Sequence, residues 1–436
     1  MSNLSELLRS IKSKTVIGIN PPVFDFAWFD LWSKPLGLLY ILEFLRTNNN
    51  DIHLIDSLYE ARTEAISFGR WKVRKSKLQK PEVYTNIPRH YYRFGLSPEE
   101  LEARLSELPK PDYILVTSAM TYWYGGVFET IKSARKIFPG ATIILGGAYA
   151  MLCHEHASKS GANLVQSVPL DIDIQLRRPA IDLYSNPGYG VVMTSYGCPM
   201  DCQYCASKKL FPHFRKRPIE DVIEDVRFQL SVCNTNSIAF YDDALLIDKR
   251  GIFFPLCEAL IKEFPGVALH TPNGLHVSQI DEECAEMLFR AGFHTLRLSL
   301  EGIDSYTGAV SGEKTGKSGY EGAIKALKGA KYPDERLETY ILVGLPGQNT
   351  DDVLNSIDYV KSLGGKPKIT EFSPIPGTEI YKRALNDCPQ LAEEPLLHNN
   401  TVYAPWVSRS VPPETMQYFK DRAKIYLIND KIPCGS

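Results

Sequence analysis

The chain has 436 residues, of which 44% are hydrophobic and 23% charged, and its 49 Lys and Arg against 51 Asp and Glu leave a net charge of −2. This composition is typical of a globular protein with two or three domains and excludes collagen-like and disordered chains. Nine cysteines are too few, and odd in number, for a secreted disulfide framework, and no apolar run approaches the roughly eighteen residues of a membrane span. We therefore expect a cytoplasmic protein without a membrane partner.

The first third of the sequence alternates short apolar runs with helix-like stretches. The runs at 15–20, 52–56, 113–118 and 142–145 are rich in β-branched residues and bounded by turn residues, as buried parallel strands are. This alternation predicts a doubly wound, Rossmann-like domain over residues 1–167, with ligands at the carboxyl ends of its strands.

A basic and aromatic insertion interrupts this pattern near residues 57–110. Residues 69–93 contain eight Lys or Arg, one acid, one Trp and three Tyr. Such a run is most often a solvated surface, although it also suits an anionic ligand or the tail of a large cofactor. Basic residues between aromatic ones fit single-stranded nucleic acid as well, but one short patch on a nearly neutral chain disfavours a nucleic-acid partner.

A second alternation of strands and helices follows a Pro-rich stretch at 168–188, which we interpret as a linker. Predicted strands near 191–195, 238–241, 268–271, 295–300, 339–343 and 368–372 are separated by helical patterns, within a domain at 189–376. Six such units form a parallel, barrel-like sheet short of the eight units of a closed barrel, with its chemistry at the carboxyl ends of the strands. Residues 377–436 are predicted as a small C-terminal extension, and the fold class is α/β.

Three cysteines directly after the first predicted barrel strand carry the strongest chemical signal. Cys198, Cys202 and Cys205 are spaced C-x3-C-x2-C in a polar loop. Three thiolates in eight residues can converge on a metal or cluster, whereas a disulfide would leave one thiol out. Zinc would require a fourth nitrogen or sulfur ligand, and no Cys or His follows at finger spacing. The spacing therefore favours an iron–sulfur cubane that leaves one iron open.

This cysteine spacing, after the first strand of a partial barrel, resembles that of the radical S-adenosylmethionine (SAM) enzymes, and the resemblance extends from about residue 190 to 381. It implies a (β/α)6 partial TIM barrel and a 4Fe–4S cluster whose open iron binds SAM. It also implies reductive cleavage of SAM to methionine and the 5′-deoxyadenosyl radical, with an electron donor of the flavodoxin or ferredoxin type. Tyr204, before the third cysteine, matches the family's aromatic residue and is expected to contact the cofactor.

Two aspartates end the second predicted barrel strand. Asp242 and Asp243 stand where other members of the family carry a Gly-Gly-Glu that receives the SAM amino group. A carboxylate at this position would accept a charge-assisted hydrogen bond from that ammonium. The alternative is that one aspartate caps the following helix.

The fourth and fifth predicted strands end in further residues that match the family. Ser299 and Glu301 alternate with apolar residues and therefore point the same way, into the barrel mouth. The resemblance places them at the ribose or methionine part of SAM and Arg297 at its carboxylate, unless Arg297 forms an ion pair inside the barrel. Gly344 and Leu345 begin a G-L-P-G sequence that the resemblance places at the adenine.

The Rossmann-like domain resembles the cobalamin-binding domain of cobalamin-dependent radical SAM enzymes, and residues 374–378, P-I-P-G-T, match the same subfamily. The resemblance implies cobalamin as a further cofactor, contacted by Asn20, Ser118, Gly146 and Gly147 after the first, third and fourth strands. Gly146 and Gly147 could equally form a plain turn. The D-x-H-x-x-G base-off motif is missing, because Asp56 stands where that motif has its last Gly.

These features predict a radical SAM enzyme, with cobalamin-dependent C-methylation of an unactivated position as the leading function. One alternative is a radical SAM enzyme that works without cobalamin, by rearrangement, oxidation or sulfur insertion, and keeps a vestigial cobalamin-type domain. A non-catalytic iron–sulfur protein is a third reading. The substrate, a small molecule or a peptide, is not specified by these motifs.

Overall fold

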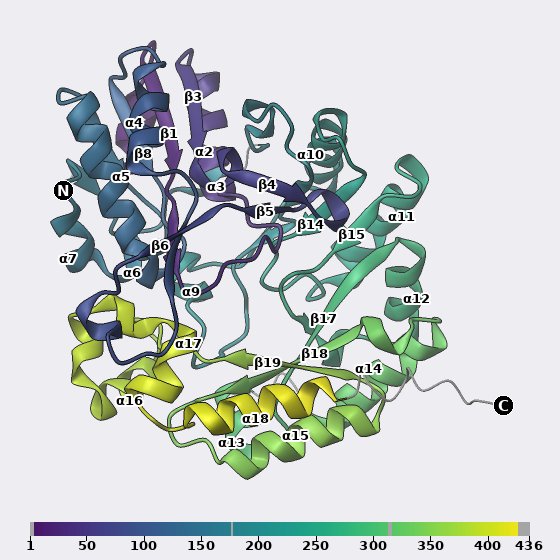
Figure 1. The fold of residues 1–436 in the computed structure, drawn as a ribbon. Helices are drawn as coiled ribbons and strands as arrows, with labels where there is room; N and C mark the ends of the chain where they lie inside the picture. The colour runs from purple at the N-terminus through teal and green to yellow at the C-terminus, as the bar shows by residue number, and fades with distance from the viewer. Residues whose placement is uncertain (1–3, 176–177, 313–315, 426–436) are drawn as a thin grey trace. The chain divides into compact units, whose positions relative to one another are not determined.

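The structure is a computed structural model that describes residues 4–175, 178–312 and 316–425. The chain divides into two compact units (Figure 1). Unit 1 comprises residues 1–191, 227–235 and 393–396, and unit 2 comprises residues 192–226, 236–392 and 397–436.

Unit 1 is built on a five-stranded parallel sheet in the order β10-β9-β8-β1-β3. The strands are β1 (Thr15–Asn20), β3 (Asp51–Asp56), β8 (Tyr113–Val116), β9 (Thr142–Leu145) and β10 (Leu164–Val165). The helices are α1 (Leu4–Ser10), α2 (Leu36–Thr47), α3 (Ser57–Glu60), α4 (Pro98–Ser106), α5 (Tyr124–Ile137), α6 (Ala148–Leu152), α7 (His154–Ala157) and α8 (Ile172–Gln175). The predicted Rossmann-like alternation is confirmed, and the strand order reverses between β1 and β8, which is where ligands bind in such sheets.

Alternate residues of each strand in this sheet pack on opposite faces. Ile17 and Ile19 of β1 join the core under α4 and α5, whereas Val16 joins the core under α1 and α2. Ile144 of β9 lies in the second core, and Leu145 lies in the first. Because both faces are covered, the strands are continuous apolar runs in the sequence.

The basic insertion folds as small antiparallel sheets. Strands β2 (Val23–Asp25), β7 (Tyr91–Phe94) and β6 (Lys75–Leu78) form one, and β4 (Arg62–Ala65) pairs with β5 (Trp71–Val73) in another. Several of its cations have acidic partners, including Lys72 with Glu64 at 2.8 Å and Arg74 with Glu100 at 2.6 Å. These two ion pairs are exposed, whereas Tyr84 and Tyr91 of the insertion are buried.

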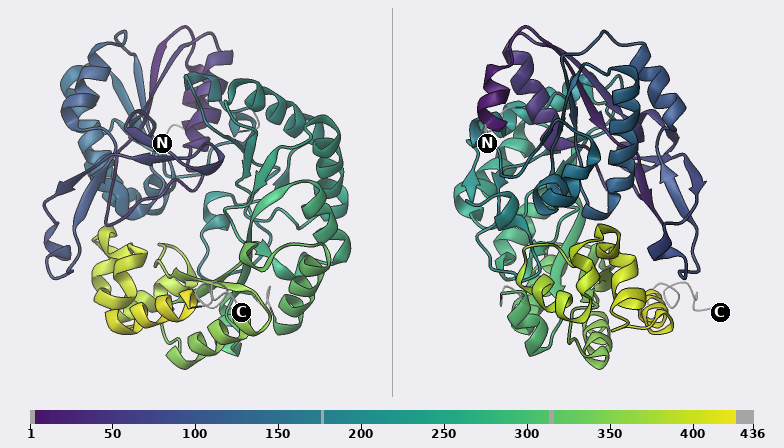
Figure 2. Two further views of the ribbon diagram at one scale, coloured as in Figure 1. Left: turned by 45° about the vertical axis from the view of Figure 1, so that its right-hand side comes forward. Right: turned by 90° about the vertical axis from the view of Figure 1, so that its left-hand side faces the viewer.

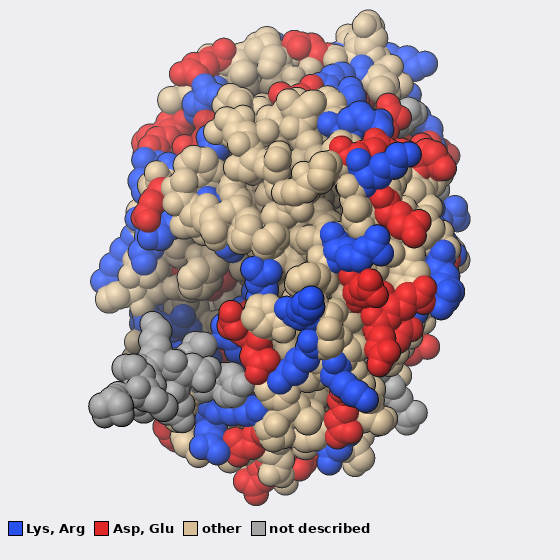
Figure 3. Space-filling model, turned by 90° about the vertical axis from the view of Figure 1, so that its right-hand side faces the viewer, with Lys and Arg blue, Asp and Glu red and all other residues tan. Residues whose placement is uncertain are grey.

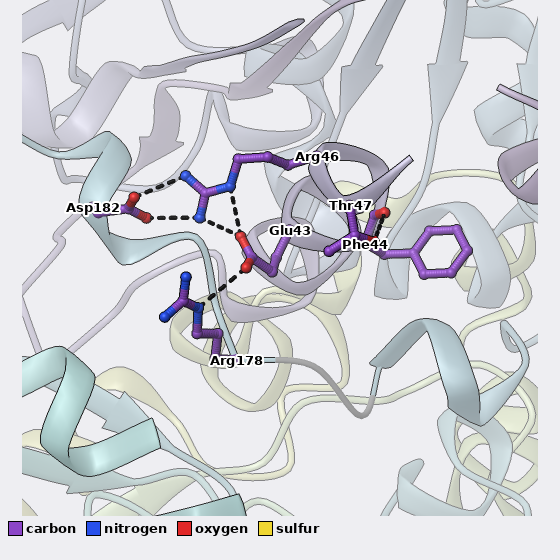
Figure 4. Close-up of polar contacts among 6 residues, drawn as sticks. All are labelled: Glu43, Phe44, Arg46, Thr47, Arg178 and Asp182. Carbon is purple, nitrogen blue, oxygen red and sulfur yellow. Dashed lines mark hydrogen bonds and ion pairs between the residues drawn. The ribbon is translucent and has the colours of Figure 1, made fainter. Parts of the chain in front are cut away.

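The Pro-rich stretch at 168–188, predicted as a linker, belongs to unit 1 and is bound to α2 by ion pairs (Figure 4). Arg46 binds both carboxylate oxygens of Asp182, at 2.8 and 3.0 Å, and also binds Glu43. Arg178 donates to the other oxygen of Glu43 at 3.1 Å. Tyr184 donates to the buried carboxylate of Asp56 at 2.7 Å. The described part of this stretch is therefore a docked segment, held by hydrogen bonds at several points along its length.

A curved parallel sheet, which lies in unit 2 except for Gly190 and Val191 of β11, has the strand order β11-β14-β15-β17-β18-β19, with β16 paired to β17. The strands are β11 (Gly190–Val192), β14 (Ser237–Phe240), β15 (Ala268–His270), β16 (Leu275–His276), β17 (Phe293–Glu301), β18 (Leu337–Val343) and β19 (Lys366–Glu371), and β12 (Ser195–Tyr196) pairs with β13 (Arg215–Lys216) outside it. This is the predicted (β/α)6 partial barrel. The first predicted strand, 191–195, is split between β11 and β12.

Helices follow the strands of unit 2 and cover the outer side of the sheet (Figures 1 and 2). They are α9 (Ser207–Leu210), α10 (Ile219–Val232), α11 (Phe254–Glu263), α12 (Glu282–Arg290), α13 (Ser305–Val310), α14 (Lys317–Gly329) and α15 (Thr350–Ser362), followed by α16 (Glu379–Asp387), α17 (Asn400–Val402) and α18 (Pro413–Lys424) of the C-terminal extension. Leu296, Leu298 and Leu300 of β17 are fully buried on this side. The inner side is therefore left to the alternate, polar residues of the strands.

Basic and acidic residues are nearly equal in number, and the net charge is −2. On the face drawn in Figure 3, basic and acidic side chains lie next to one another between tan areas. No helix within the described residues is both long and apolar enough to cross a membrane.

The Tyr184→Phe substitution should destabilise the protein by about 1–3 kcal/mol, because the buried Asp56 carboxylate loses a charge-assisted hydrogen bond. Urea unfolding followed by circular dichroism measures the change. The control is Tyr113→Phe at a half-buried residue of β8, which should change stability by less than about 0.5 kcal/mol. Equal stability of the Tyr184 variant and the parent would show that the segment is not held through this contact.

Candidate active site at the strand ends of unit 2

The carboxyl ends of the unit 2 strands surround a pocket with about 920 Å³ of empty space, part of it open to solvent. It brings together residues from the cysteine loop and from β14 to β19. The lining residues are Cys198, Cys202, Tyr204, Cys205, Asp243, Asn273, Gly274, His276, Ser299, Glu301, Tyr340, Leu342, Thr370, Glu371, Phe372, Ser373 and Ile375. All of them belong to unit 2.

The cysteine loop is held in place through its backbone. The Gln203 N–H donates to the Val310 carbonyl at the end of α13 at 2.8 Å, and the Gln203 carbonyl accepts from the Ile380 N–H in α16 at 3.1 Å. The Cys202 thiol donates to the Ser311 carbonyl at 3.3 Å. Two helices far apart in the sequence therefore position the loop.

The three thiols of the cysteine loop lie in one pocket at the strand ends of unit 2. Within the described residues, no group of three or more His, Cys, Asp or Glu side chains is placed to hold one metal ion. Ligands of a cubane bind three different irons and therefore lie farther apart than ligands of one ion. Cys198, Cys202 and Cys205 line one pocket, and three thiolates in one pocket are a donor set for an iron–sulfur cubane.

The two predicted aspartates have different places. The buried carboxylate of Asp242 accepts hydrogen bonds from the backbone N–H groups of Thr194 and Ser195, at 3.0 and 2.8 Å, and from their hydroxyls, at 2.6 and 2.9 Å. Burial raises the pKa of Asp242, and these four donors oppose that shift. Asp242 therefore supports the turn that leads into the cysteine loop and is not among the residues that line the pocket.

Asp243 is the aspartate that lines the pocket. Its carboxylate accepts a hydrogen bond from the Ser207 hydroxyl at 2.6 Å, and burial raises its pKa. The structure therefore distinguishes the two aspartates, which the sequence alone did not: Asp243 lines the pocket, and Asp242 does not.

Ser299 and Glu301 both line the pocket, as their alternation predicts. Glu301 is a non-glycine residue with φ of 64°, in the left-handed region, and the register of β17 against β18 shifts between Ser299 and Glu301. Its carboxylate contacts the Tyr204 hydroxyl, and burial together with this carboxylate raises the pKa of Tyr204. Backbone strain of this kind concentrates at functional sites, where the surrounding structure holds a side chain in a required direction.

Three other predicted residues lie outside the lining of the pocket. Arg297 forms an ion pair with Glu338, which is the alternative that its sequence position left open. Gly344 and Leu345 form a turn whose N–H groups point to the Gln348 side chain, at 2.9 and 3.4 Å. A Cβ on Gly344 would lie 2.5 Å from Ala404 Cβ, so the C-terminal extension requires glycine there.

Several lining residues were not predicted from the sequence, among them His276, Tyr340 and Thr370. Tyr340 and Thr370 lie on the same side of the sheet as Ser299, so the alternation that identified Ser299 could have found them. His276 lies on the short strand β16, opposite Ser299 in register, and no sequence pattern marks this pairing.

The residues predicted to contact cobalamin lie at the carboxyl ends of β1, β8 and β9 in unit 1. Asn20 donates to the Asp56 carboxylate at 2.9 Å, and the Ser118 hydroxyl donates to the Gly146 carbonyl at 3.1 Å. Gly147 has φ of 97°, and a Cβ there would lie 2.2 Å from the Ser118 carbonyl oxygen. The close approach of two loops therefore requires this glycine, and its contact with cobalamin stays a prediction.

The two aspartates should respond differently to removal of their charge. Asp242→Asn should lower the free energy of unfolding by about 1.5–3 kcal/mol, because it weakens buried charge-assisted hydrogen bonds. Asp243→Asn should lower the free energy of unfolding less than Asp242→Asn, because the Ser207 hydroxyl can still donate to the amide oxygen, but should weaken SAM binding roughly tenfold or more. Urea unfolding and equilibrium dialysis with SAM measure the two effects. If Asp242→Asn instead weakened SAM binding and Asp243→Asn lowered the stability more, the roles assigned to Asp242 and Asp243 would be reversed.

Residues 192–360 match the model of the Radical SAM superfamily. Among curated proteins, an uncharacterized methyltransferase of Pyrococcus horikoshii is 28% identical over 210 residues, which are 47% of this chain and 44% of that protein. The ribosomal protein uS12 methylthiotransferase RimO of Acetivibrio thermocellus is 24% identical over 209 residues, 46% of this chain and 45% of that protein. The chain thus spans less than half the length of these relatives.

Two solved structures share the fold over most of the chain. The radical SAM methyltransferase TsrM of Kitasatospora setae, with tryptophan and a SAM analogue bound, has a TM-score of 0.62 and 13% identity, over 87% of this chain and 77% of its own. The cobalamin-dependent SAM radical enzyme OxsB, with aqua-cobalamin and SAM bound, has a TM-score of 0.59 and 12% identity, over 87% of this chain and 56% of its own. Residues 192–360 therefore match the Radical SAM superfamily, and the chain has, over most of its length, the fold of these two enzymes.

Proposed function

We propose that the protein is a radical SAM methyltransferase that works with cobalamin on an unactivated carbon of a small molecule or peptide. The observation that carries the proposal is the single pocket in which three thiols meet a buried set of polar side chains at the strand ends of the barrel. The fold shared with TsrM and OxsB supports the methyltransferase type and the use of cobalamin.

The cysteine loop has the donor set for a 4Fe–4S cluster, which when bound supplies the electron that cleaves SAM to methionine and the 5′-deoxyadenosyl radical. Cys198, Cys202 and Cys205 would hold it through their thiolates, in a loop that two helices fix. A protein of the flavodoxin or ferredoxin type would deliver the electron. The radical SAM domain implies these cofactors.

The charge of the pocket suits SAM, which carries a sulfonium and an ammonium group. Asp243, Glu301 and Glu371 line it, and none of its described lining residues is Lys or Arg. Asp243 would accept the SAM ammonium. Ser299 and Glu301 would orient the ribose or methionine part, with Tyr204 fixing the Glu301 carboxylate.

Three exposed apolar side chains in the loops at the carboxyl edge of the unit 1 sheet would contact cobalamin, which when bound supplies the methyl group. Phe29, whose exposed fraction is 73%, and Leu31 lie in the connection from β1 to α2, and the exposed Met120 lies in the connection from β8 to α5. These two connections flank the point where the strand order reverses. Exposed apolar side chains at such a point are suited to cover the face of a large flat ligand.

A radical SAM enzyme that works without cobalamin is the second candidate, because the base-off motif for cobalamin is missing from the sequence and one curated relative is a methylthiotransferase. In that case SAM would be cleaved in the same pocket, and unit 1 would serve as a scaffold.

Replacing Cys198, Cys202 and Cys205 together by Ala should abolish both reconstituted iron of about four per chain and formation of 5′-deoxyadenosine from SAM, because no thiolate remains to hold the cluster. Iron analysis and chromatography of the reaction products, both under anaerobic conditions, measure these losses. Cys153→Ala, a thiol of unit 1, is the control and should retain both. A triple variant that keeps its full iron content would refute the cluster assignment.

Protein purified anaerobically and supplied with hydroxocobalamin should retain corrinoid absorption bands after desalting. Met120→Asp should reduce the bound corrinoid at least tenfold, because a charge replaces an exposed apolar contact, and should leave the iron content unchanged. Lys325→Gln on α14 is the control. Formation of 5′-deoxyadenosine by a protein that retains no corrinoid would favour the second candidate.

A further inference from the structure

A cationic layer lies on the inner face of the unit 2 sheet, next to the pocket on the amino-terminal side. Ser299, Tyr340 and Thr370 line the pocket from three neighbouring strands. Side chains two residues apart on a strand point to the same face. The residues two positions earlier on β17, β18 and β19 therefore share this face, and they are Arg297, Glu338 and Lys368.

The strand register brings a further lysine into the same layer. Glu338 is paired with Arg297 on one side and with Lys366 on the other, and Lys368 is the next inward residue of β19. We call Arg297, Lys366, Lys368 and Glu338 the cationic layer.

Three cationic groups in this layer share one carboxylate. Arg297 forms an ion pair with Glu338, Lys366 Nζ lies 3.3 Å from one of its oxygens, and Lys368 Nζ lies 3.5 Å from the other. The exposed fractions of the cationic side chains are 13% for Arg297, 25% for Lys366 and 42% for Lys368. The layer is thus shielded enough for strong electrostatic interaction and open enough for an anion to reach the lysines.

The pocket is lined by acidic side chains, whereas the cationic layer contains mostly basic ones. The pocket is lined by Asp243, Glu301 and Glu371, the last paired with Lys420 at 2.7 Å. Two residues along a parallel strand separate the layers by roughly 7 Å. Tyr340 lies between them, and its hydroxyl contacts both Arg297 and the Pro272 carbonyl. A molecule that extends from one layer to the other would therefore need an anionic group about one side chain's length from the part that faces SAM.

We propose that the cationic layer binds an oxyanion group of the substrate, a carboxylate or a phosphate, and thereby presents the rest of the molecule to the pocket. The inference rests on the proposed radical SAM function, since it assigns a substrate class to that same site. In the ion pairs given above, the Glu338 carboxylate faces the cationic groups of Arg297, Lys366 and Lys368, an arrangement that an oxyanion of the substrate would complement.

The test is calorimetric titration of the anaerobic, cluster-loaded full chain with inorganic phosphate and, separately, with succinate. We expect saturable binding of at least one of them. The double variant Lys366→Gln/Lys368→Gln should weaken that binding at least tenfold, whereas Lys368→Arg and the exposed control Lys325→Gln should retain it. Binding of phosphate alone would identify a phosphorylated substrate, and binding of succinate alone a carboxylic acid.

Absence of binding of either anion to the parent would overturn the inference, as would binding that survives in the double variant. Phosphate binding that appears only in Glu338→Gln would also overturn it, because Glu338 would then neutralise the layer by itself. SAM binding and 5′-deoxyadenosine formation without added substrate are measured in the same samples. If the double variant binds SAM and forms 5′-deoxyadenosine normally but no longer binds the anion, both the radical SAM function and the anion site are supported. If the parent neither binds SAM nor forms 5′-deoxyadenosine, the proposed radical SAM function is refuted, whatever the result for the anion.

Discussion

The carboxylate of Asp242 is the contact on which the candidate active site depends. It gathers two backbone N–H groups and two hydroxyls from Thr194 and Ser195 at the point where the chain leaves β11 and approaches the cysteines. A charged group this deeply buried is stable only when donors surround it. The arrangement fixes the entry of the cysteine loop against β14, and the contacts of Gln203 with α13 and α16 fix the loop farther along. The thiols are therefore positioned from both sides before any cluster is bound.

Acidic and basic side chains occupy different levels on the inner face of the barrel. Acidic side chains lie at the mouth, where SAM would bring positive charge, and cationic side chains lie one layer deeper. Glu301 occupies the mouth at the cost of a left-handed backbone, and the Tyr204 hydroxyl contacts its carboxylate. Such a gradient would hold an extended molecule in one direction, because reversing it would bring like charges together.

In unit 1, apolar side chains are buried on both faces of the sheet, but some are exposed at the carboxyl edge. Inside the sheet, alternate residues fill two separate cores, and the docked segment around Tyr184 and Asp182 completes the side next to α2. At the carboxyl edge, however, Phe29, Leu31 and Met120 remain exposed. Single exposed apolar side chains are common on protein surfaces. It is their position beside the point of strand reversal, where ligands bind in such sheets, that motivates the assignment of a ligand to that edge.

The sequence by itself determined the α/β class, the two alternations of strands and helices, and the spacing of Cys198, Cys202 and Cys205, because these depend on local patterns of two to eight residues. It also indicated that Ser299 and Glu301 share a face, since alternation along one strand is local. Only the tertiary structure decided between Asp242 and Asp243, because that choice depends on donors about 50 residues away. The same holds for Arg297, whose partner Glu338 comes from the next strand, and for His276, which reaches the pocket by pairing with β17. The docking of the Pro-rich stretch also required the fold, since Arg46 and Asp182 are 136 residues apart. Contacts at such separations leave no pattern in one sequence.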